Sequence, residues 1–385
     1  MSKITKVFIA TILLVLMFSS AFTAFCAPAT MPFDVEAKAA LLMDCSSGTV
    51  LYEKNADQKL PIASITKVMT LCIIFDEIEQ GNLKLDDMVM VSPKAANVGG
   101  SYVLTDANYS YKASELIKSI IIASANDCAA AMAEHISGTE EAFVERMNSK
   151  AAEMNMTNTT FKNCTGLPAD GHLSTARDVS IMTTALMKHS DYFKWSNIWM
   201  DTIIHKDNRA TELVNTNRLI RYYEGCDGGK TGYTSEAKFC ISASAKRGNT
   251  RLIAVVLGGD TSPIRFAETT KLLNYGFANY TTIKLVDSTK ALEQSIPLQN
   301  GLDKTVMVKP AHDFSLVVRK GEEKQVQHQT ILPDIIKAPV SAGAQVGEII
   351  ITQNGIEKGR APLIAAADYK EAKYFDYVKK ILTWW

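Results

Sequence analysis

Hydrophobic residues recur with two different periods along the chain, and these periods separate strands from helices. Ala39 to Asp44 and Thr49 to Lys54 are apolar-rich runs on either side of the turn residues 45–48, a pattern that predicts a β-hairpin. Downstream, hydrophobic residues three and four apart predict a long helical region. Its helices are expected at Lys112 to Ala123, Asp127 to Ser137, Glu140 to Asn155 and Thr175 to His189. The last of these begins with a capping-box pattern.

Strand-like segments return in the second half of the chain. Gly229 to Thr234, Lys238 to Ala245 and Arg251 to Gly258 alternate or run apolar between turns, which predicts strands. A helix is expected over roughly Ile264 to Tyr280. Strands at both ends of a mostly helical stretch predict an α/β fold whose sheet joins early and late segments.

Beyond Tyr280 the pattern changes to short alternating runs separated by Gly, Pro and Asp. Such runs predict a small antiparallel β-sandwich. They lie at Ile283 to Val286, Thr305 to Val308, Ser315 to Val318 and Gly347 to Thr352. We find no catalytic constellation in this part of the sequence.

The segment Asp368 to Trp385 has the pattern of an amphipathic helix. One helical face collects Tyr374, Phe375, Val378, Ile381, Leu382 and Trp385, and the opposite face carries Lys370, Lys373, Asp376, Lys380 and Thr383. The segment is too short and too charged to cross a bilayer. Terminal tryptophans with flanking lysines are typical of a helix that lies in the membrane surface. A helix packed on the sandwich is the alternative.

The first 29 residues resemble a cleavable secretory signal. Lys3 and Lys6 precede an almost wholly apolar run from Val7 to Phe22, and small residues follow at 24–29. This order of basic, apolar and small residues is typical of a leader that is removed on export. An uncleaved anchor helix is the alternative, although the apolar run is short for a membrane span.

Composition limits the classes of function. The 385 residues are 47% apolar, with 41 basic and 41 acidic side chains, enough chain for one large domain and a smaller one. This charge balance gives no reason to expect nucleic acid as a partner. Six cysteines follow the leader, which permits disulfides, but no Cys/His spacing indicates a metal, and no cofactor is predicted. Cys72, Cys128 and Cys240 lie in apolar runs and are expected to be core residues.

The segment Pro61 to Thr70 carries the first candidate chemistry. Ser64 and Lys67 stand three residues apart before the apolar run 71–75, so in a helix they share one face. A lysine desolvated there can lose its proton near neutral pH and accept the proton of the serine. The alternative is a helix N-cap serine beside a solvated lysine. A second S-x-x-K match, Ser235 to Lys238, lies in a polar turn and is interpreted as coincidence.

The second candidate is Ser124-Ala125-Asn126, which interrupts two helical stretches. A serine hydroxyl and an asparagine amide projected from such a break can relay a proton and hydrogen-bond a substrate amide. The same residues are also typical of a helix start with Asp127 as its cap.

The third candidate is the glycine-rich stretch Gly228 to Thr234, which opens a strand pair. Lys230 supplies a point charge, Thr231 a hydroxyl group, and Gly232 allows a substrate backbone to lie close to the strand edge. A phosphate-binding P-loop is excluded because the G-x-x-x-x-G-K spacing is absent and the strand follows the lysine. An ordinary turn is the remaining alternative.

In the order S-x-x-K, S-x-N, K-T-G, the three elements form the set found in penicillin-binding proteins and class A β-lactamases. From about Phe33 to its C-terminus, the chain resembles the low-molecular-weight penicillin-binding proteins that are serine D-Ala-D-Ala carboxypeptidases. Further matching stretches are 124–127, 165–178 and 227–234.

The resemblance implies a domain order. After a signal peptide at 1–29, it implies a catalytic domain at 30–280, a β-sandwich domain at 281–366 and a membrane-interface helix at 367–385. The catalytic domain would be of the penicillin-binding-protein/β-lactamase type, an antiparallel sheet with flanking helices and an all-helical lobe.

The resemblance also implies an acyl-enzyme mechanism. Ser64 would attack the carbonyl between the two terminal D-alanines of a peptidoglycan stem peptide. Lys67 would act as the base, and Ser124 would relay a proton to the leaving amine. The backbone N–H groups of Ser64 and Tyr233 would form the oxyanion hole.

Substrate binding is implied for five residues beside this catalytic set. Asn126 would hold the substrate amide, and Lys230 and Thr231, next to Gly232, would meet the terminal carboxylate. Arg265 stands where family members carry an arginine near that carboxylate, although an arginine at a helix start is more often simply solvated.

Partners and location follow from the same resemblance. Peptidoglycan stem peptides are the expected substrates and β-lactam antibiotics the expected covalent inhibitors. With its leader and its tail, the protein is expected on the outer face of the cytoplasmic membrane, and secreted if the tail is removed.

Two rival functions use the same motifs. A β-lactamase needs a glutamate to activate its deacylating water, and Thr165 to Asp178, the nearest stretch in order, contains none. A penicillin sensor would be acylated without turnover, so the steady release of D-alanine distinguishes an enzyme from a sensor.

Overall fold

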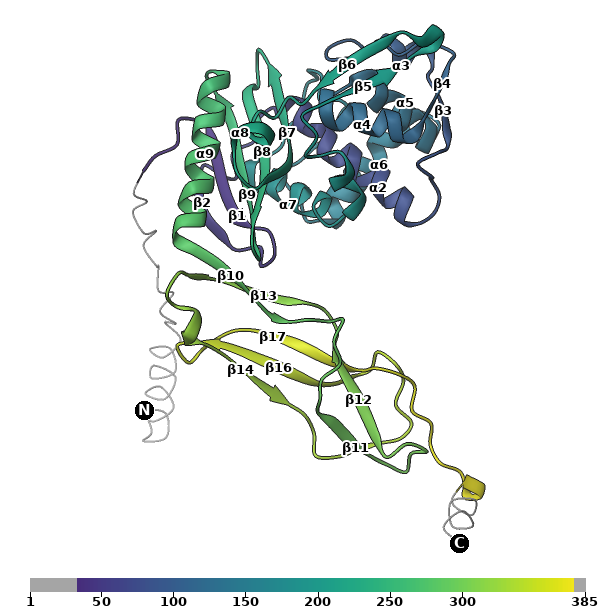
Figure 1. The fold of residues 1–385 in the computed structure, drawn as a ribbon, viewed down its shortest axis with the longest axis vertical. Coiled ribbons are helices and arrows are strands. Elements are labelled where there is room, and N and C mark those ends of the chain that lie inside the picture. The colour runs from purple at the N-terminus through teal and green to yellow at the C-terminus, as the bar shows by residue number, and fades with distance from the viewer. Residues whose placement is uncertain (1–32, 377–385) are drawn as a thin grey trace, which may run out of the picture. The chain divides into compact units, whose positions relative to one another are not determined.

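The computed structural model describes residues 33–376 (Figure 1). The predicted leader and most of the predicted C-terminal helix lie outside these residues. A five-stranded antiparallel sheet in the order β2-β1-β9-β8-β7 organises the catalytic part. Its strands are β1 (Ala39–Asp44), β2 (Val50–Lys54), β7 (Cys226–Thr234), β8 (Lys238–Arg247) and β9 (Thr250–Gly259).

The sheet joins the beginning of this domain to its end, as predicted. β1 pairs with β9 so that Leu42 faces Ala254 across the ladder. β7, which carries Lys230, Thr231 and Gly232, lies at the opposite edge, and among the described residues its one partner strand is β8. The free edge of β7 is therefore available to an extended peptide.

Helices α7 (Ala176–Leu186) and α9 (Ser262–Asn279) cover the two faces of the sheet (Figure 1). Side chains alternate between faces along a strand. Leu42 therefore packs under Gly276 of α9, whereas Met43 contacts Ser180 of α7. A Cβ atom at Gly276 would lie 2.5 Å from the Leu252 side chain and 3.0 Å from that of Leu42, so a side chain there would force these packed core leucines to shift.

A helical lobe contains α2 (Lys67–Glu79), which contacts α5, α6 and α7. Residues 67–75 of α2 are all buried, because this helix is apolar on every side and lies within the core. The other main helices of the lobe are α4 (Ala113–Ala123), α5 (Asn126–Ser137) and α6 (Glu140–Glu153). All begin or end within two residues of the predicted bounds.

Short elements that the sequence pattern did not indicate complete this domain. They are the hairpins β3 (Met88–Met90) with β4 (Ser110–Lys112) and β5 (Met200–Ile204) with β6 (Ala210–Val214), and the short helices α3 (Pro93–Ala96) and α8 (Leu219–Tyr222). Single 3-10 turns lie at Ala63–Thr66, Ser190–Lys194 and Lys206–Asn208.

The C-terminal part is a β domain, as predicted. It contains a two-stranded sheet, β10 (Tyr280–Val286) with β13 (Phe314–Arg319), and a six-stranded sheet in the order β14-β16-β17-β12-β11-β15. The strands of the second sheet are β11 (Ser295–Gln299), β12 (Thr305–Pro310), β14 (Val326–Ile331), β15 (Ile336–Lys337), β16 (Gln345–Gln353) and β17 (Ile356–Ala365). The short pair of β11 and β15 is parallel and the other pairs are antiparallel.

Two observations concern the whole described chain. The six cysteines of residues 33–376 are free, and Cys72, Cys128 and Cys240 are fully buried, as predicted. Within the same residues, no helix has both the length and the apolar character needed to cross a membrane.

Candidate active site

Ser64 lies in the 3-10 turn Ala63–Thr66, directly before α2. Ala63 has a left-handed backbone with φ 47°, and two glycines pack against it. A Cβ atom at Gly166 would lie 1.9 Å from the Ala63 carbonyl oxygen, and one at Gly232 would lie 3.0 Å from the Ser64 nitrogen. The turn is thus held between the 166 loop and strand β7, and the Ser64 N–H lies beside the strand that carries Tyr233.

Lys67 is fully buried one turn after Ser64. Its Nζ donates to Ser64 Oγ at 3.0 Å and to the Thr165 carbonyl oxygen at 2.7 Å. Burial lowers the pKa of Lys67 to about 7, because the charged ammonium loses its hydration. The alternative of a solvated lysine is wrong. A neutral amine at this position can accept the serine proton.

Ser124 occupies the break between α4 and α5 in the left-handed conformation, with φ 63° and ψ 31°. A non-glycine residue with this backbone is uncommon and often marks a functional site. Its side chain is buried, and no direct hydrogen bond joins it to Ser64 or Lys67 within the part of the chain that the structure describes. Helix α5 begins at Asn126 with Ala125 as its N-cap, so the alternative of Asp127 as the cap is wrong.

Asn126 is also buried and has one free polar atom. Its Nδ2 donates to the Gly99 carbonyl oxygen at 2.7 Å, whereas its Oδ1 has no hydrogen-bond partner among the described residues. A buried polar atom without a partner costs about 1–3 kcal/mol. A substrate N–H group would satisfy it.

Asp127 is a residue to which sequence reasoning gave no role in the site. Its carboxylate accepts hydrogen bonds from the backbone N–H of Val103 and Thr105, the latter at 3.0 Å, and from the Thr105 hydroxyl. The Ser101 carbonyl in turn accepts from the Asn126 N–H at 2.7 Å. Asp127 therefore fixes segment 101–105 against the start of α5.

Lys230 and Arg265 form a cationic pocket at the K-T-G strand. Burial, reinforced by the positive charges of Lys67 and Arg265, holds the pKa of Lys230 well below its usual range. Arg265 is only 7% exposed, so the alternative of a solvated arginine is wrong. Its Nη1 donates to the Gly232 and Cys240 carbonyl oxygens at 3.3 Å, and its Nε has no hydrogen-bond partner among residues 33–376.

These cations lack an anion. Within residues 33–376, none of Lys67, Lys230 and Arg265 has a carboxylate within ion-pair distance, and burial lowers the pKa of Arg265 to about 10. The Thr231 hydroxyl beside them donates to Thr216 Oγ1 at 2.8 Å. A bound carboxylate beside Lys230 and Arg265 would offset the repulsion between these two cations and favour their charged forms.

The side chain of Tyr233 is 57% exposed and lies against Phe239, with ring centroids 4.4 Å apart. Only its backbone is placed for a role at Ser64. In the second S-x-x-K match, Ser235 lies in the turn between β7 and β8 and Lys238 begins β8, and both residues are exposed. This exposure supports the interpretation of that match as coincidence.

A cavity of about 490 Å³ lies beside Ala63, the residue before Ser64. Ala63, the 166–173 loop, Thr234 and Glu236 line it. Since this cavity borders the far end of the K-T-G strand from Lys230, it can receive the part of a peptide that precedes the reacting carbonyl.

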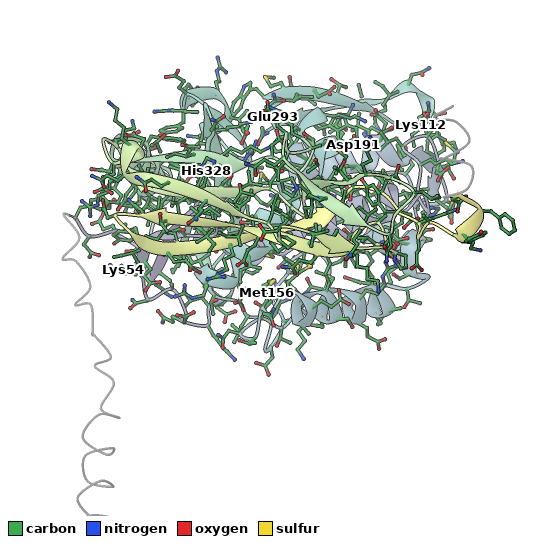
Figure 2. All side chains as sticks on the ribbon, turned by 90° about the horizontal axis from the view of Figure 1, so that it is seen from below. Lys54, Lys112, Met156, Asp191, Glu293 and His328 are labelled. Carbon is green, nitrogen blue, oxygen red and sulfur yellow. The ribbon has the colours of Figure 1, made fainter. Side chains whose placement is uncertain are left out.

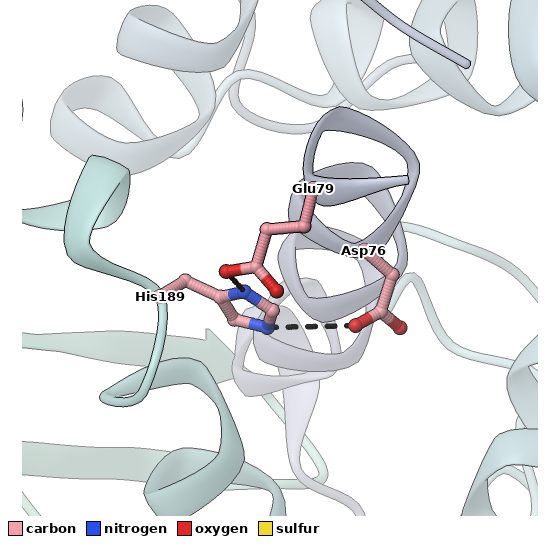
Figure 3. A group of neighbouring side chains, drawn as sticks. All are labelled: Asp76, Glu79 and His189. Atoms are coloured by element: carbon pink, nitrogen blue, oxygen red, sulfur yellow. Dashed lines mark hydrogen bonds and ion pairs between the residues drawn. The ribbon is translucent and has the colours of Figure 1, made fainter. Parts of the chain in front are cut away.

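Figure 3 shows a group of potential metal ligands, Asp76, Glu79 and His189. His189 Nδ1 lies 2.7 Å from Glu79 Oε1, and His189 Nε2 lies 3.6 Å from Asp76 Oδ1. Asp76 also pairs with Lys150. Because each ring nitrogen already faces a carboxylate, and a lysine shares one carboxylate, we interpret the group as an ion-pair network that ties the end of α2 to the segment after α7.

The geometry defines a serine acyl-transfer enzyme for an anionic substrate. The chain matches the D-alanyl-D-alanine carboxypeptidase family over residues 26–261 and the penicillin-binding protein 5 C-terminal domain over residues 280–371. It therefore belongs to the D-alanyl-D-alanine carboxypeptidase family, the serine-type low-molecular-weight penicillin-binding proteins.

Similar proteins cover nearly the whole chain. D-alanyl-D-alanine carboxypeptidase DacF of Bacillus subtilis (strain 168) is 39% identical over 351 residues, which are 91% of this chain and 90% of that protein. DacC of Escherichia coli (strain K12) is 34% identical over 92% of this chain and 90% of its own length. The crystal structure of penicillin binding protein 5 from Haemophilus influenzae matches with a TM-score of 0.75 at 30% identity, covering 89% of this chain and 100% of that one.

Proposed function

We propose that this enzyme removes the terminal D-alanine from peptidoglycan stem peptides through an acyl-enzyme on Ser64. The observation that carries the proposal is the pair of Ser64 Oγ and Lys67 Nζ, 3.0 Å apart with the lysine fully buried. A buried amine with a pKa of about 7 is half neutral at neutral pH, so it can work as a general base.

Acylation begins when neutral Lys67 takes the proton of Ser64 Oγ. The oxygen attacks the carbonyl between the two D-alanines, and the backbone N–H groups of Ser64 and Tyr233 stabilise the oxyanion. Losing one such donor typically costs about 10²–10³ in rate. Lys230 holds the terminal carboxylate.

The cationic pocket places the substrate for this attack. Arg265 and the Thr231 hydroxyl act with Lys230 on the carboxylate, and the free Oδ1 of Asn126 accepts the N–H of the preceding peptide bond. These contacts align an extended peptide along the free edge of β7 beside Gly232, where a side chain would collide with the Ile62 carbonyl.

Collapse of the tetrahedral intermediate breaks the C–N bond. The leaving D-alanine amine takes a proton that Ser124 relays from Lys67. Water then attacks the ester and gives its proton back through the same groups, which releases the shortened peptide and restores Ser64. A β-lactam enters by the first step, since it presents an amide carbonyl and a carboxylate to the same groups.

Incubation with labelled penicillin followed by peptide mapping tests the nucleophile. We expect one adduct, on Ser64, and none in Ser64→Ala. Ser235→Ala is the matched control and should be labelled like the native protein. An adduct on Ser235 or on a cysteine would show that the nucleophile is wrong.

Release of D-alanine from a synthetic peptide ending in D-Ala-D-Ala separates the enzyme from a penicillin sensor. The enzyme releases D-alanine steadily over many turnovers. A protein that binds penicillin on Ser64 but releases no D-alanine would be a sensor.

We also propose that the exported protein sits on the outer face of the cytoplasmic membrane through its C-terminal segment. Two aromatic side chains at the end of the described residues support this, since Tyr374 is 77% and Phe375 81% exposed. Tyr369, by contrast, is buried in the β domain and its hydroxyl accepts from the Met307 N–H at 2.8 Å. Residues 368–373, predicted as the start of the C-terminal helix, are not helical and pair with the β domain through the bridges Val340–Tyr369 and Gly301–Glu371. The predicted start of the helix at Asp368 is therefore wrong, and we place the start of the proposed membrane segment after residue 373.

A further inference from the structure

His172 lies in the 166–173 loop and connects this loop to the 3-10 turn that carries Ser64. It is only 4% exposed. Its Nε2 lies 2.8 Å from Thr66 Oγ1, and its Nδ1 lies 3.2 Å from the backbone nitrogen of Lys162. Thr66 is the last residue of the turn, is fully buried and directly precedes Lys67. The mechanism proposed above gives no role to His172 or Thr66.

The hydrogen bonds of the His172 ring fix the position of its proton. The backbone N–H of Lys162 can only donate, so Nδ1 is the acceptor and carries no proton. In a neutral imidazole the proton then lies on Nε2, which therefore donates to Thr66 Oγ1. Burial and the charge of Lys162 lower the pKa of His172 to about 4, so the ring is neutral and keeps this donor near neutral pH.

The loop that carries His172 is itself held in place. Thr160 and Leu173 pair through two backbone hydrogen bonds, of 2.9 and 3.2 Å, on either side of the loop. Phe161 packs edge-on against the His172 ring, with ring centroids 5.8 Å apart. The Nε2 donor therefore reaches the turn from a fixed position.

The turn needs support from outside because its own backbone does not stabilise it. Ala63 has a left-handed backbone, with φ 47°, and no side-chain hydrogen bond caps the start of the turn within residues 33–376. Such a conformation persists only where the surroundings hold it. Lys67 Nζ also bonds to the loop, at the Thr165 carbonyl oxygen, but this amine gains and loses a proton during the reaction. The bond from His172 does not take part in the chemistry and stays constant.

We infer that His172 is a positioning residue for acylation, which holds Ser64 Oγ in line with Lys67 Nζ by donating to Thr66. The inference rests on the proposed acyl-enzyme on Ser64. Among the described residues, His172 makes no hydrogen bond to Ser64 or Lys67, so it acts through Thr66. Since a displacement of about 1 Å can lower a rate by about 10²-fold, loss of this contact should be visible in the acylation rate.

Two substitutions separate the roles of the two ring nitrogens. In His172→Asn, the amide oxygen takes the place of Nδ1 and accepts from the Lys162 N–H, but the side chain is too short to reach Thr66. In His172→Gln, the amide nitrogen takes the place of Nε2 and donates to Thr66, while the Lys162 N–H loses its acceptor. Each variant leaves one buried group without a partner, so both should lower the thermal midpoint by similar amounts.

The measurement is single-turnover acylation by labelled penicillin, which separates binding of the drug from the covalent step. We expect His172→Asn to lower the acylation rate constant by about 10²-fold. The dissociation constant of the noncovalent complex should stay unchanged, because Lys230 and Arg265 are untouched. His172→Gln should restore most of the native rate constant. A general weakening of the loop would affect the two variants alike.

A substitution at the other end of the bond gives an independent test. Thr66→Val removes the acceptor of the Nε2 donor, so it should slow acylation as His172→Asn does. Because the two substitutions break the same contact, the double variant should be no slower than either single one. This result can be read even where a variant at 172 does not fold.

His205 is the matched control for loss of a buried histidine. It is 3% exposed, and its ring nitrogens lie 3.0 Å from the Tyr111 hydroxyl and 2.8 Å from Thr211 Oγ1. It directly follows β5, away from the turn that carries Ser64. His205→Asn should lower the thermal midpoint and keep the native acylation rate constant.

Two results would overturn the inference and leave Ser64 as the nucleophile. One is an equal acylation rate constant in His172→Asn and His172→Gln, whether native or reduced. The other is native acylation in Thr66→Val. A native protein that forms no adduct on Ser64 would instead overturn the proposed function, and the inference with it.

Discussion

Lys67 couples the chemistry of the site to the stability of the fold. Its pKa is about 7 in the folded protein and ordinarily near 10.5. Between these values the unfolded chain holds the proton that the folded chain has lost, so the free energy of unfolding rises with pH across this window. Below pH 7 the buried charge is a net cost. The burial that makes Lys67 a base near neutral pH therefore also lowers the free energy of unfolding there.

The first prediction is a pH profile of acylation. The rate of acylation by labelled penicillin should rise as pH increases, with a midpoint near 7, because only neutral Lys67 can take the serine proton. Stopped-flow or quenched measurements from about pH 5 to about pH 9 would record it, since an acidic limb reports the pKa of the free base.

Lys67→Met is the control for this profile. Methionine keeps most of the packing but removes the base, so acylation should fall by about 10²–10⁴, the range of general-base catalysis. The thermal midpoint should not fall far, since a buried amine is replaced by an apolar group. A flat pH profile in the native protein would assign the base to another group.

The site residues differ in how far sequence alone could place them. Ser64 and Lys67 were predicted because two residues three apart at the start of an apolar helix lie on the same face of that helix. The burial of Arg265 was not predictable, because an arginine at a helix start is usually solvated and only the packing of α9 against β8 encloses it. Asp127 was missed because its partners, Val103 and Thr105, lie in an irregular segment with no pattern of its own.

At the scale of elements, the site depends on contacts between irregular segments. The 3-10 turn before α2 is enclosed by the loop at Gly166 and by strand β7 at Gly232. Gly166 has φ +84°, and any Cβ atom there would lie within 2.3 Å of the Ala63 carbonyl group. A side chain at residue 166 is therefore excluded for two reasons. The backbone there is left-handed, and the side chain would collide with the 3-10 turn that carries Ser64.

The second prediction compares two glycines of this loop. Gly166→Ala should displace the Ser64 turn and abolish acylation by labelled penicillin. Gly171→Ala has a similar left-handed backbone, φ +73°, but its nearest atom would be the Lys162 side chain at 3.5 Å. It should cost about 1 kcal/mol of stability and keep most of the activity. Equal losses in the two variants would mean that backbone strain, and not contact with Ala63, matters at Gly166.

The third prediction concerns Asp127. Asp127→Ala leaves the N–H groups of Val103 and Thr105 buried without an acceptor, at about 1–3 kcal/mol each. The thermal midpoint should fall and acylation should slow, because segment 101–105 no longer fixes the start of α5 beside Ser124. Thermal unfolding and penicillin labelling measure the two effects.

Thr105→Val is the matched control for Asp127. It removes only the hydroxyl hydrogen bond to the carboxylate and keeps both backbone bonds, so its effects should be clearly smaller. An Asp127→Ala variant with native stability and native acylation would contradict the positioning role.

Prediction of helices and strands from the sequence succeeded where the segment with a hydrophobic period was long. Helices α4, α5 and α6 lie within two residues of their predicted bounds, and α7 begins one residue after its predicted start and ends three residues before its predicted end. The three-residue strands β3 and β4 are too short to show a period. β14 was missed because its middle residues are polar and exposed, as for His328 (Figure 2).

At the scale of the whole molecule, the three motifs come from distant parts of the chain. Ser64 lies before α2, Ser124 between α4 and α5, and Lys230 on β7, near the end of the catalytic part. Pairing of β1 with β9 closes the sheet and brings these segments together. The strand pattern predicted that the sheet joins early and late segments, but it did not place the three motifs beside one another. The family resemblance, and not periodicity, predicted that the motifs form one site.

The last prediction concerns the attachment of the protein to the membrane. Burying the apolar face that the sequence predicts for 374–385 gains roughly 25 cal/mol per Å², and each lysine near an anionic surface adds up to about 1 kcal/mol. Attachment should therefore be reversible and sensitive to charge.

A chain ending at Lys373 keeps Tyr369 in the β domain, where its N–H and carbonyl pair with Val340, and should still release D-alanine. The full chain should co-sediment with phosphatidylglycerol vesicles, less with phosphatidylcholine vesicles, and the shortened chain with neither. Equal sedimentation of the two chains would mean that the tail packs on the protein, and the localisation would be wrong while the chemistry of Ser64 stood.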